Sequence, residues 1–436
     1  MMADVIEFTG KGWRARLIKK DGKPAKISAN VVTFLREHPD WKGVLAYDLF
    51  AERVLTLKRP PWDKLDAPKE WSSEWTDADT GRLVAWLARK EKIEIGKDKC
   101  DSAVQIAAEA QSFHPVRDYL SKLVWDQKPR LEMMLSDFFG AKDTPYTRGV
   151  SLRWPISAVA RVMQPGCQAD CTIVLESKEQ GTGKSTALEA LAGSEWFADT
   201  SVTVGDKDSY QNLRGIWIYE LGELDSVRKA ETTKVKNFLS PRSDRYRPSF
   251  GTRSRDFKRQ NVFAGTTNEE QYLADWENRR YWPVRVVAPM RVAELKENRD
   301  QIWAEALRRY SMGERWHVDT PQFHALCKSE QEERISAHPL EPVVATWLKK
   351  PTSDDGARVL DLGAGVTTSD VLIHCLHKRL ADIERGDENL IAGILRRLGW
   401  AIRHRTTHEG IRAYRYFTTA LYDSYVLLES GEVGHT

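Results

Sequence analysis

The pattern of hydrophobic and polar positions divides the chain into stretches that predict different structures. Residues 13–58 mix strand-like alternation, first seen at residues 13–18, with one capped helix. From residue 76 to residue 163 the apolar positions recur every three or four residues, which predicts a series of helices. Short apolar runs, including one at residues 201–204, then alternate with helical stretches between residues 171 and 287. This alternation predicts an α/β core in which helices cover a parallel sheet.

The remainder of the chain has a different order. A charged helical stretch follows the predicted core, and a Ser-Asp-Asp-Gly joint separates it from the last segment. That segment contains two helical patterns and then a basic hairpin, an order typical of a winged helix. We therefore expect four parts: a small α+β module at residues 1–62, a helical domain at 63–168, the nucleotide-binding core with a helical extension at 169–337, and a winged-helix-like domain at 338–436.

Composition narrows the possible partners and compartments. The 436 residues carry a net charge of only +3, so affinity for nucleic acid has to come from local basic patches. Five scattered cysteines lack zinc-site spacing and are expected to be reduced thiols in a cytoplasmic protein. The sequence shows no signal peptide and no run of about 18 apolar residues, so we expect no membrane segment.

A glycine-containing loop provides the first candidate chemistry. Apolar residues 172–175 predict a buried strand, a loop with Gly181 and Gly183 follows, and a helical pattern begins after Lys184. A strand, such a loop and a helix N-terminus together form a phosphate cradle. Lys184 is expected to reach the β- and γ-phosphates of ATP, and the Ser185 hydroxyl to hold Mg²⁺. The predicted ATP-binding residues are Gln180, Gly181, Thr182, Gly183, Lys184, Ser185 and Thr186.

One position of this loop departs from the usual P-loop pattern. Lys178 stands six residues before Lys184, where P-loops normally have a glycine. The part that wraps the phosphates is intact. We therefore expect nucleotide binding and leave open whether Lys178 alters hydrolysis.

Hydrolysis requires further groups beyond the loop. The apolar strand at residues 216–219 leads to Glu220 and Glu223. Ligands of open parallel sheets bind at the carboxyl ends of strands, so these acids are candidates for holding Mg²⁺ and for polarising the attacking water. We assign the metal to Glu220 and the water to Glu223, although the pattern also allows the reverse assignment.

Two further signals follow the acidic strand. Asn268 ends the next strand and is expected to contact the attacking water or the γ-phosphate. Arg279 and Arg280 precede another strand, and arginine is suited to stabilising phosphoryl charge in cis or from a neighbouring subunit. The sequence does not distinguish which arginine has this role.

Residues 241–260 contain seven Arg or Lys against two Asp. Cations interleaved with aromatic residues are typical of surfaces that grip phosphates and stack on bases. Gly251 suggests the tip of a hairpin. The predicted DNA-binding residues are Arg245, Tyr246, Arg247, Arg255, Lys258 and Arg259. A second candidate is the C-terminal hairpin, with Arg403, Arg405, Arg412 and Arg415.

With these motifs in order, the chain resembles the virulence-associated protein E family of phages and mobile islands, a branch of the superfamily 3 helicase-like ATPases. The matching stretches, between about residues 110 and 290, are 114–120 with Trp125 and Asp126, 159–162 with Pro165 and Gly166, 175–186, 217–224, 244–251, 265–268 and 278–284. One departure is that Glu220 and Glu223 are spaced apart, where superfamily 3 proteins often have adjacent acids.

The resemblance implies an ATP-driven DNA helicase or translocase, with an AAA+-like core, that forms a hexameric ring in the cytoplasm of a bacterial host. ATP would lie between subunits, with Arg279 or Arg280 reaching from the neighbour, and residues 244–259 would project into the channel. Single-stranded or forked DNA would be the substrate, with ATP and Mg²⁺ as cofactors. Many relatives carry a primase module before the ATPase. The N-terminal part is too short for one, so we expect any primase or polymerase to be a separate protein.

Two other functions remain open from the sequence. The protein could be an origin-binding initiator for which ATP is only an assembly switch, as the basic C-terminal hairpin would suit. It could also be a regulatory or defence ATPase with a protein target, in which case DNA would not stimulate hydrolysis. Ring size, direction of movement and origin sequence are not encoded in any motif that we identify.

Overall fold

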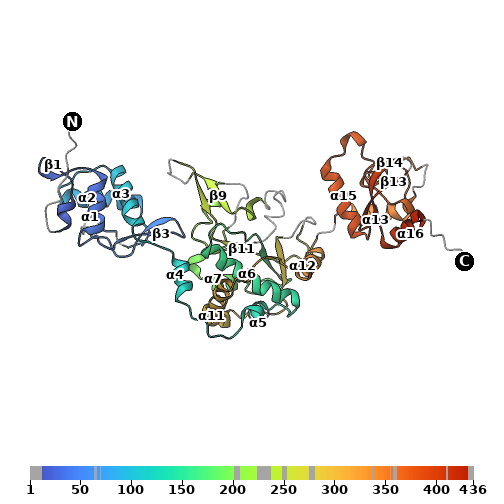
Figure 1. The fold of residues 1–436 in the computed structure, drawn as a ribbon, viewed down its shortest axis with the longest axis horizontal. Coiled ribbons are helices and arrows are strands. Elements are labelled where there is room, and N and C mark those ends of the chain that lie inside the picture. The colour runs from blue at the N-terminus through green and yellow to red at the C-terminus, as the bar shows by residue number, and fades with distance from the viewer. Residues whose placement is uncertain are drawn as a thin grey trace. The chain divides into compact units, whose positions relative to one another are not determined.

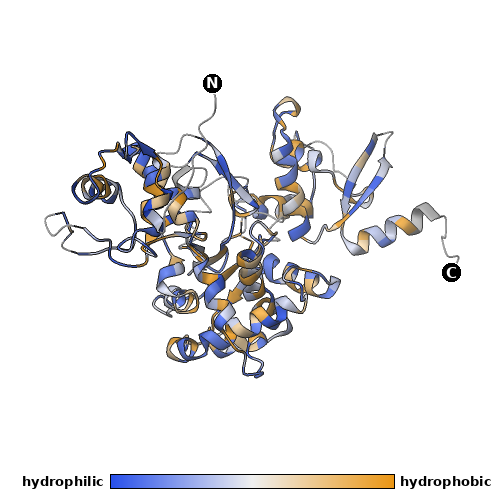
Figure 2. Ribbon diagram, turned by 60° about the vertical axis from the view of Figure 1, so that its left-hand side comes forward, coloured by the Kyte–Doolittle hydropathy of each residue, from blue (hydrophilic) through white to orange (hydrophobic). Residues whose placement is uncertain are grey.

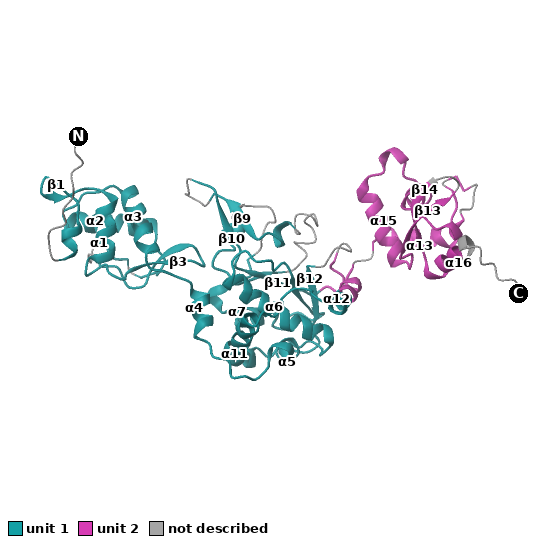
Figure 3. Ribbon diagram, in the orientation of Figure 1, with its two compact units in different colours: residues 1–268, 280–327 teal, residues 269–279, 328–436 magenta. Residues whose placement is uncertain are grey.

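The computed structural model describes residues 12–62, 66–68, 70–200, 207–222, 237–247, 253–273, 280–335, 338–353, 355–356, 361–408 and 411–430. The chain divides into two compact units (Figure 3). The first comprises residues 1–268 and 280–327, and the second comprises residues 269–279 and 328–436. Figure 1 labels helices and strands of both units.

The N-terminal part of the first unit has its own hydrophobic core. Its main elements are α1 (Ser28–Glu37), β3 (Leu45–Asp48), β4 (Arg53–Thr56), α2 (Asp77–Lys90), α3 (Lys97–Glu109) and β5 (Ser112–Phe113). Trp41 is fully buried, and its ring contacts the rings of Trp62, Trp75 and Trp86. The core therefore includes residues on both sides of position 62, the predicted boundary of the first module.

The strand predicted at residues 13–18 is wrong. Trp13–Arg16 form a 3-10 turn instead. The Trp13 ring packs edge-on against Phe34 of α1, with 5.1 Å between ring centroids, and against His38 at 5.2 Å. Packing of this indole on the helix accounts for a turn where the alternation alone predicted a strand. The strand predicted at residues 201–204 lies outside the described residues.

The centre of the first unit is a five-stranded parallel sheet, as predicted. Its order is β12-β6-β11-β8-β7. The strands are β6 (Thr172–Glu176), β7 (Phe197–Ala198), β8 (Ile218–Leu221), β11 (Val262–Thr267) and β12 (Tyr281–Arg285). Every residue of β6, β8 and β11 is buried, which explains why these strands appear as continuous apolar runs rather than alternating ones. The strand β11 lies between the strand of the phosphate loop and the acidic strand.

Helices pack against this sheet and share its core. They are α4 (Pro115–Lys122), α5 (Met134–Asp137), α6 (Pro145–Met163), α7 (Lys184–Ala192) and α11 (Val292–Ser311). The short α8 (Lys207–Gln211) also belongs to this unit. Figure 2 shows hydrophobic residues concentrated in the sheet and in the helices beside it. The helix α6 starts at a Thr144 capping box and has residues in the same core as the strands, so the predicted helical domain contributes directly to the core of the parallel sheet.

Several buried tryptophans tie these layers together by hydrogen bonds as well as by burial. Trp154 of α6 donates its indole N–H to the carbonyl of Phe263 at 3.1 Å. Trp217, just before β8, donates to the carbonyl of Ala158 at 3.0 Å, and its ring stacks on that of Trp303 with 4.1 Å between centroids. A buried indole with a satisfied N–H adds a large apolar surface without a desolvation penalty.

An antiparallel hairpin stands apart from the parallel sheet. It consists of β9 (Ser243–Tyr246) and β10 (Arg255–Lys258), in a register that pairs Arg255 with Tyr246 and Lys258 with Ser243. This pairing agrees with the hairpin expected in the basic stretch. The connecting residues 248–252, where a tip was expected at Gly251, lie outside the described residues.

The second unit contains most of the C-terminal third of the chain. The helix α12 (Pro321–Glu333) leads into it, followed by α13 (Glu341–Lys349), the short α14 (Thr368–Asp370) with a π-helical turn at Val371–Cys375, and α15 (Arg385–Arg397). The hairpin of β13 (Ile402–His408) and β14 (Ile411–Phe417) and then α16 (Thr419–Ser430) complete the unit. Its core joins these helices and the base of the hairpin. In the described part of the chain, no helix is long and apolar enough to cross a bilayer.

Candidate nucleotide site

The loop between β6 and α7 has the backbone geometry that a phosphate cradle requires. Gly181 has a φ of 75° and Gly183, the residue that caps α7, has a φ of 87°. Residues with a β-carbon rarely adopt such angles, so glycine suits both positions. Lys184 is the first residue of α7, whose early N–H groups have no partner within the helix and carry a partial positive charge. An anion at this position would be stabilised by the loop and by the helix.

Glu220 lies on β8 directly opposite this loop. The carboxylate is only 1% exposed. Its Oε1 accepts hydrogen bonds from the Ser185 hydroxyl at 2.7 Å and the Thr266 hydroxyl at 2.6 Å. Its Oε2 is also buried and has no hydrogen-bond partner among the described residues. Burial raises the pKa of Glu220, and the two hydroxyl donors partly oppose that rise.

Lys184 and Asn268 meet at the same edge of the sheet. The Lys184 ammonium donates to the Asn268 side-chain oxygen at 2.8 Å. Asn268 directly follows β11, and Lys184 follows the loop from the neighbouring β6. Partial burial lowers the pKa of Lys184, while the charge of Glu220 raises it. Because the strands are parallel, their carboxyl ends bring residues that are distant in sequence to one edge.

These side chains suit a magnesium ion bound together with a nucleotide. Mg²⁺ prefers oxygen ligands and usually keeps waters and substrate phosphates in its shell. Glu220 and Ser185 supply two oxygens, one of which is Oε2, the buried atom described above. No group of three or more His, Cys, Asp and Glu side chains is placed for metal binding in the part of the chain that the structure describes. Nucleotide phosphates and water would supply further ligands to a metal bound by these two side chains.

Arg280 lies at the amino-terminal ends of the strands, whereas the phosphate loop lies at their carboxyl ends. Its carbonyl accepts from the N–H of Thr172, the first residue of β6, and its guanidinium donates to the Ser240 hydroxyl at 2.6 Å and lies 3.9 Å from Asp170. A five-residue strand separates it from the phosphate loop, roughly 16 Å at the usual rise. The chain therefore does not bring Arg280 to its own loop. The other two predicted catalytic residues, Glu223 and Arg279, lie outside the described residues.

The predicted DNA-binding residues fall into two groups. Arg245, Arg247, Arg255 and Lys258 are exposed on the hairpin of β9 and β10. Tyr246 and Arg259 are only 7% and 3% exposed, which differs from the expectation that both reach DNA. The Tyr246 ring stacks on Phe257 with 4.5 Å between centroids.

Arg259 is engaged inside the base of the hairpin. Its guanidinium forms two hydrogen bonds to the two carboxylate oxygens of Asp244, both at 2.7 Å, and also donates to the carbonyl of Phe238. A buried bidentate pair of this kind holds the base of the hairpin together. Arg259 is therefore a structural residue, and four of the predicted DNA-binding residues, all cations, remain exposed on the hairpin.

Two contributors to these sites were not predicted. Thr266, which bonds Glu220, has a recognisable signal because it occupies the same face of β11 as Asn268, two residues later. Glu52, in the turn between β3 and β4, lies 3.0 Å from Arg255 of the hairpin. Nothing local in the sequence links Glu52 to a residue 203 positions away.

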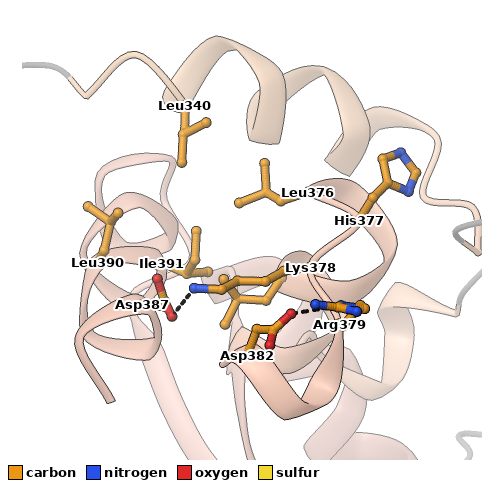
Figure 4. Close-up of a pocket in the computed structure, with 10 residues that line it drawn as sticks. Leu340, Leu376, His377, Lys378, Arg379, Asp382, Asp387, Leu390 and Ile391 are labelled. Atoms are coloured by element: carbon orange, nitrogen blue, oxygen red, sulfur yellow. Dashed lines mark hydrogen bonds and ion pairs between the residues drawn. The ribbon is translucent and has the colours of Figure 1, made fainter. Parts of the chain in front are cut away.

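The second unit contains a separate cavity of about 440 Å³. Leu340, Leu376 and Leu390 line part of it, and its charged groups pair with one another: Lys378 with Asp387, and Arg379 with Asp382 at 2.8 Å (Figure 4). Charges that are already paired offer little to a phosphate, so this cavity is not an alternative nucleotide site.

The fold and the site together define an α/β protein whose parallel sheet carries a P-loop-like segment, an acid and an asparagine at one edge. Comparison with known families then identifies the family of this protein. The profile of the Virulence-associated protein E-like domain matches residues 120–336, a range that contains the phosphate loop, Glu220 and Asn268. The chain belongs to the virulence-associated protein E family.

Other comparisons are more distant. No curated protein matches the sequence. Among solved structures, an apo structure of the NrS-1 C terminal region has a TM-score of 0.43 and 12% identity, and covers 86% of this chain and 95% of that one. The A form apo structure of the same region has a TM-score of 0.41 with the same identity and coverage.

Proposed function

We propose that the protein is an Mg²⁺-dependent ATPase that moves along or unwinds DNA during replication of a phage or mobile genetic element. The observation that carries this proposal is the convergence of four side chains on the phosphate loop: Lys184 with Asn268, and Ser185 with Glu220. The family assignment supports a role in phage or mobile-element replication.

The chemistry follows from the groups at this edge. Lys184 would stabilise negative charge on the β- and γ-phosphates, and Asn268 would orient the attacking water or the γ-phosphate. The hydrogen bond from Ser185 to Glu220 favours Glu220 as the metal-side acid, which leaves water activation to Glu223. Bound Mg²⁺ would neutralise phosphate charge.

We further propose an AAA+-like superfamily 3 core that assembles as a hexameric ring with ATP between subunits. The position of Arg280 far from its own loop supports a trans-acting arginine. Because Arg280 is engaged by Ser240 and Asp170, we favour Arg279 as the residue that reaches the neighbour's ATP. The order of three helical segments and a hairpin in the second unit supports a winged-helix-like C-terminal domain.

DNA is the proposed polymer because the hairpin of β9 and β10 presents four exposed cations. Arg245 is 75% exposed at its side chain and lies 4.0 Å from Asp256, too exposed for a strong ion pair. Arg247 follows it at the end of β9. Such cations gain binding free energy by releasing counterions from phosphates. We propose that Arg245 and Arg247 contact single-stranded DNA.

The test is the ATPase rate with and without single-stranded DNA. We expect DNA to stimulate the wild type and the double variant Arg245→Gln/Arg247→Gln to lose most of that stimulation while it keeps the DNA-free rate. The control is Arg308→Gln/Arg315→Gln, which removes the same charge from exposed positions outside the hairpin. A wild-type rate that is indifferent to DNA would instead support the regulatory ATPase, and hydrolysis without strand displacement on a fork would support the initiator.

A further inference from the structure

The hairpin of β13 and β14 in the second unit has two faces of different character. On the inner face, Thr406, Arg415 and Phe417 are buried. Arg415 donates to the carbonyl of Gly365 at 3.2 Å, and Phe417 lies where a β-carbon on Gly365 would clash with its ring. These contacts anchor the hairpin, so Arg415, although predicted as a DNA contact, belongs to the structural side.

The outer face carries Arg403, Arg405, Arg412 and Tyr414, all of them exposed, and the buried Tyr416 opposite Arg403. Side chains alternate between the two faces of a strand, and the register pairs Arg405 with Tyr414 and Thr407 with Arg412. The three arginines therefore lie on one face. The described residues of the two strands include no Asp or Glu. Figure 2 shows the same hairpin as a mainly hydrophilic pair of strands.

Two of these arginines are held in place by the aromatic ring. The Arg403 guanidinium lies 4.0 Å from the Tyr414 ring centroid, and that of Arg405 lies 5.7 Å from it. From the end of α15, Arg396 approaches the Tyr416 ring at 5.9 Å and adds a fourth exposed cation nearby. Cation–π contacts orient guanidiniums but do not neutralise them. Residues two positions apart on one face of a strand are separated by about 7 Å, so like charges at these positions repel each other. A bound anion would relieve this repulsion.

We propose that this outer face binds the phosphodiester backbone of duplex DNA, as a second DNA contact that does not depend on the nucleotide site or on the β9–β10 hairpin. Guanidinium groups match phosphate oxygens in charge and geometry. Arg403 covers one face of the Tyr414 ring, so at most the other face of this half-exposed ring could meet a base. Three arginines beside one such ring favour contacts to the phosphodiester backbone over base stacking, as expected for a duplex, whose bases are already stacked.

The test uses the full-length protein and fluorescence anisotropy with a labelled duplex and with the corresponding single strand, over a series of salt concentrations without nucleotide. The variant Arg403→Gln/Arg405→Gln/Arg412→Gln removes three charges. Its control, Lys350→Gln/Arg379→Gln/Arg385→Gln, removes three charges from exposed positions of the same unit. Both are also compared in the Arg245→Gln/Arg247→Gln background, which separates this site from the hairpin of the first unit.

We expect the outer-face variant to bind the duplex at least about tenfold more weakly near 0.15 M salt and to lower the salt slope by about 2.7, the value for three phosphate contacts. The control should bind like the wild type. The variant Arg403→Lys/Arg405→Lys/Arg412→Lys should retain the slope, because it keeps the charges.

Three results would overturn the proposal. The first is that the Gln variant binds the duplex with the same affinity and the same salt slope as the wild type. In that case the outer face would bind a protein partner or no partner. The second is a loss confined to the single strand. The third is an equal loss in the Gln and Lys variants, because only a disturbed fold would affect both alike.

Discussion

Glu220 and Asp244 are both buried acids of the first unit, 1% and 7% exposed, yet their surroundings are opposite. Asp244 has both oxygens bonded to one guanidinium, that of Arg259. Glu220 has two hydroxyl donors on one oxygen and, among the described residues, no hydrogen bond to the other. Burying a charge costs free energy unless the charge is paired, so the pairing of Asp244 with Arg259 is explained by a structural role alone. The incomplete environment of Glu220 is better explained by a ligand that completes it.

The largest expected effect concerns the ligand side of this comparison. Lys184→Ala should lower ATP hydrolysis by about 1000-fold, because it removes the cation that faces the developing phosphate charge. The measurement is phosphate release at saturating ATP and Mg²⁺. Lys178→Ala, a lysine of the same loop at the position where P-loops have glycine, is the control and should stay within a few-fold of the wild type. Equal losses in both variants would mean that loop structure, not Lys184, had been tested.

On the structural side, Asp244→Ala should lower the free energy of unfolding by about 3–5 kcal/mol, because it leaves Arg259 charged and unpaired inside the protein. Glu220→Gln should change it by less than about 1 kcal/mol, since the amide oxygen can still accept from Ser185 and Thr266. Urea unfolding measures both. A larger loss for Glu220→Gln than for Asp244→Ala would reverse the roles assigned to the two acids.

The pH dependence of stability sharpens the same comparison. The pKa of Glu220 in the folded protein is raised above its ordinary value of 4.5, mainly by burial. The folded state therefore holds this proton more tightly than the unfolded chain, and Glu220 costs stability as the pH rises from about the unfolded value through the raised one. Without nucleotide or Mg²⁺, Glu220→Gln should gain stability relative to the wild type across that interval. A constant or falling difference in urea midpoints would contradict the raised pKa.

The smallest effect is expected for an ion pair that is not buried. Glu52 and Arg255 lie 3.0 Å apart, but the Arg255 side chain is 52% exposed. Exposed pairs contribute little because water and salt screen them. Arg255→Gln should therefore change the free energy of unfolding by less than about 1 kcal/mol in the same urea experiment. A loss as large as that of Asp244→Ala would show that burial does not separate these pairs as we argue.

The convergence of Lys184, Ser185, Glu220 and Asn268 was largely predictable from the sequence. The loop around Lys184 is a local pattern, and Glu220 and Asn268 follow apolar strands whose carboxyl ends must share an edge in a parallel sheet. The same reasoning could have found Thr266, which shares its strand face with Asn268. The sequence shows the order of the loop, the acid and the asparagine along the chain. The parallel arrangement of the strands brings these residues close together in space.

The basic stretch was less predictable for a physical reason. Composition shows which residues are cationic or aromatic but not which of them are already engaged. Arg259 and Tyr246 appear in the same pattern as Arg245 and Arg247. Inside the hairpin, however, Arg259 pairs with Asp244 and the Tyr246 ring stacks on Phe257. Trp13 is a similar case, because the helix against which it packs decides its conformation. Tertiary contacts between distant residues decided each of these outcomes.

The most direct test is whether Mg²⁺ strengthens nucleotide binding through Glu220. Titration calorimetry with a non-hydrolysable ATP analogue, with and without Mg²⁺, would be done on the wild type and on Glu220→Gln. We predict that Mg²⁺ lowers the Kd of the wild type at least about tenfold, because the Glu220 carboxylate becomes a ligand of the Mg²⁺ that the nucleotide phosphates hold. Glu220→Gln should lose most of this gain in affinity and should bind the metal-free analogue as well as the wild type does. An undiminished Mg²⁺ effect in Glu220→Gln would contradict the account.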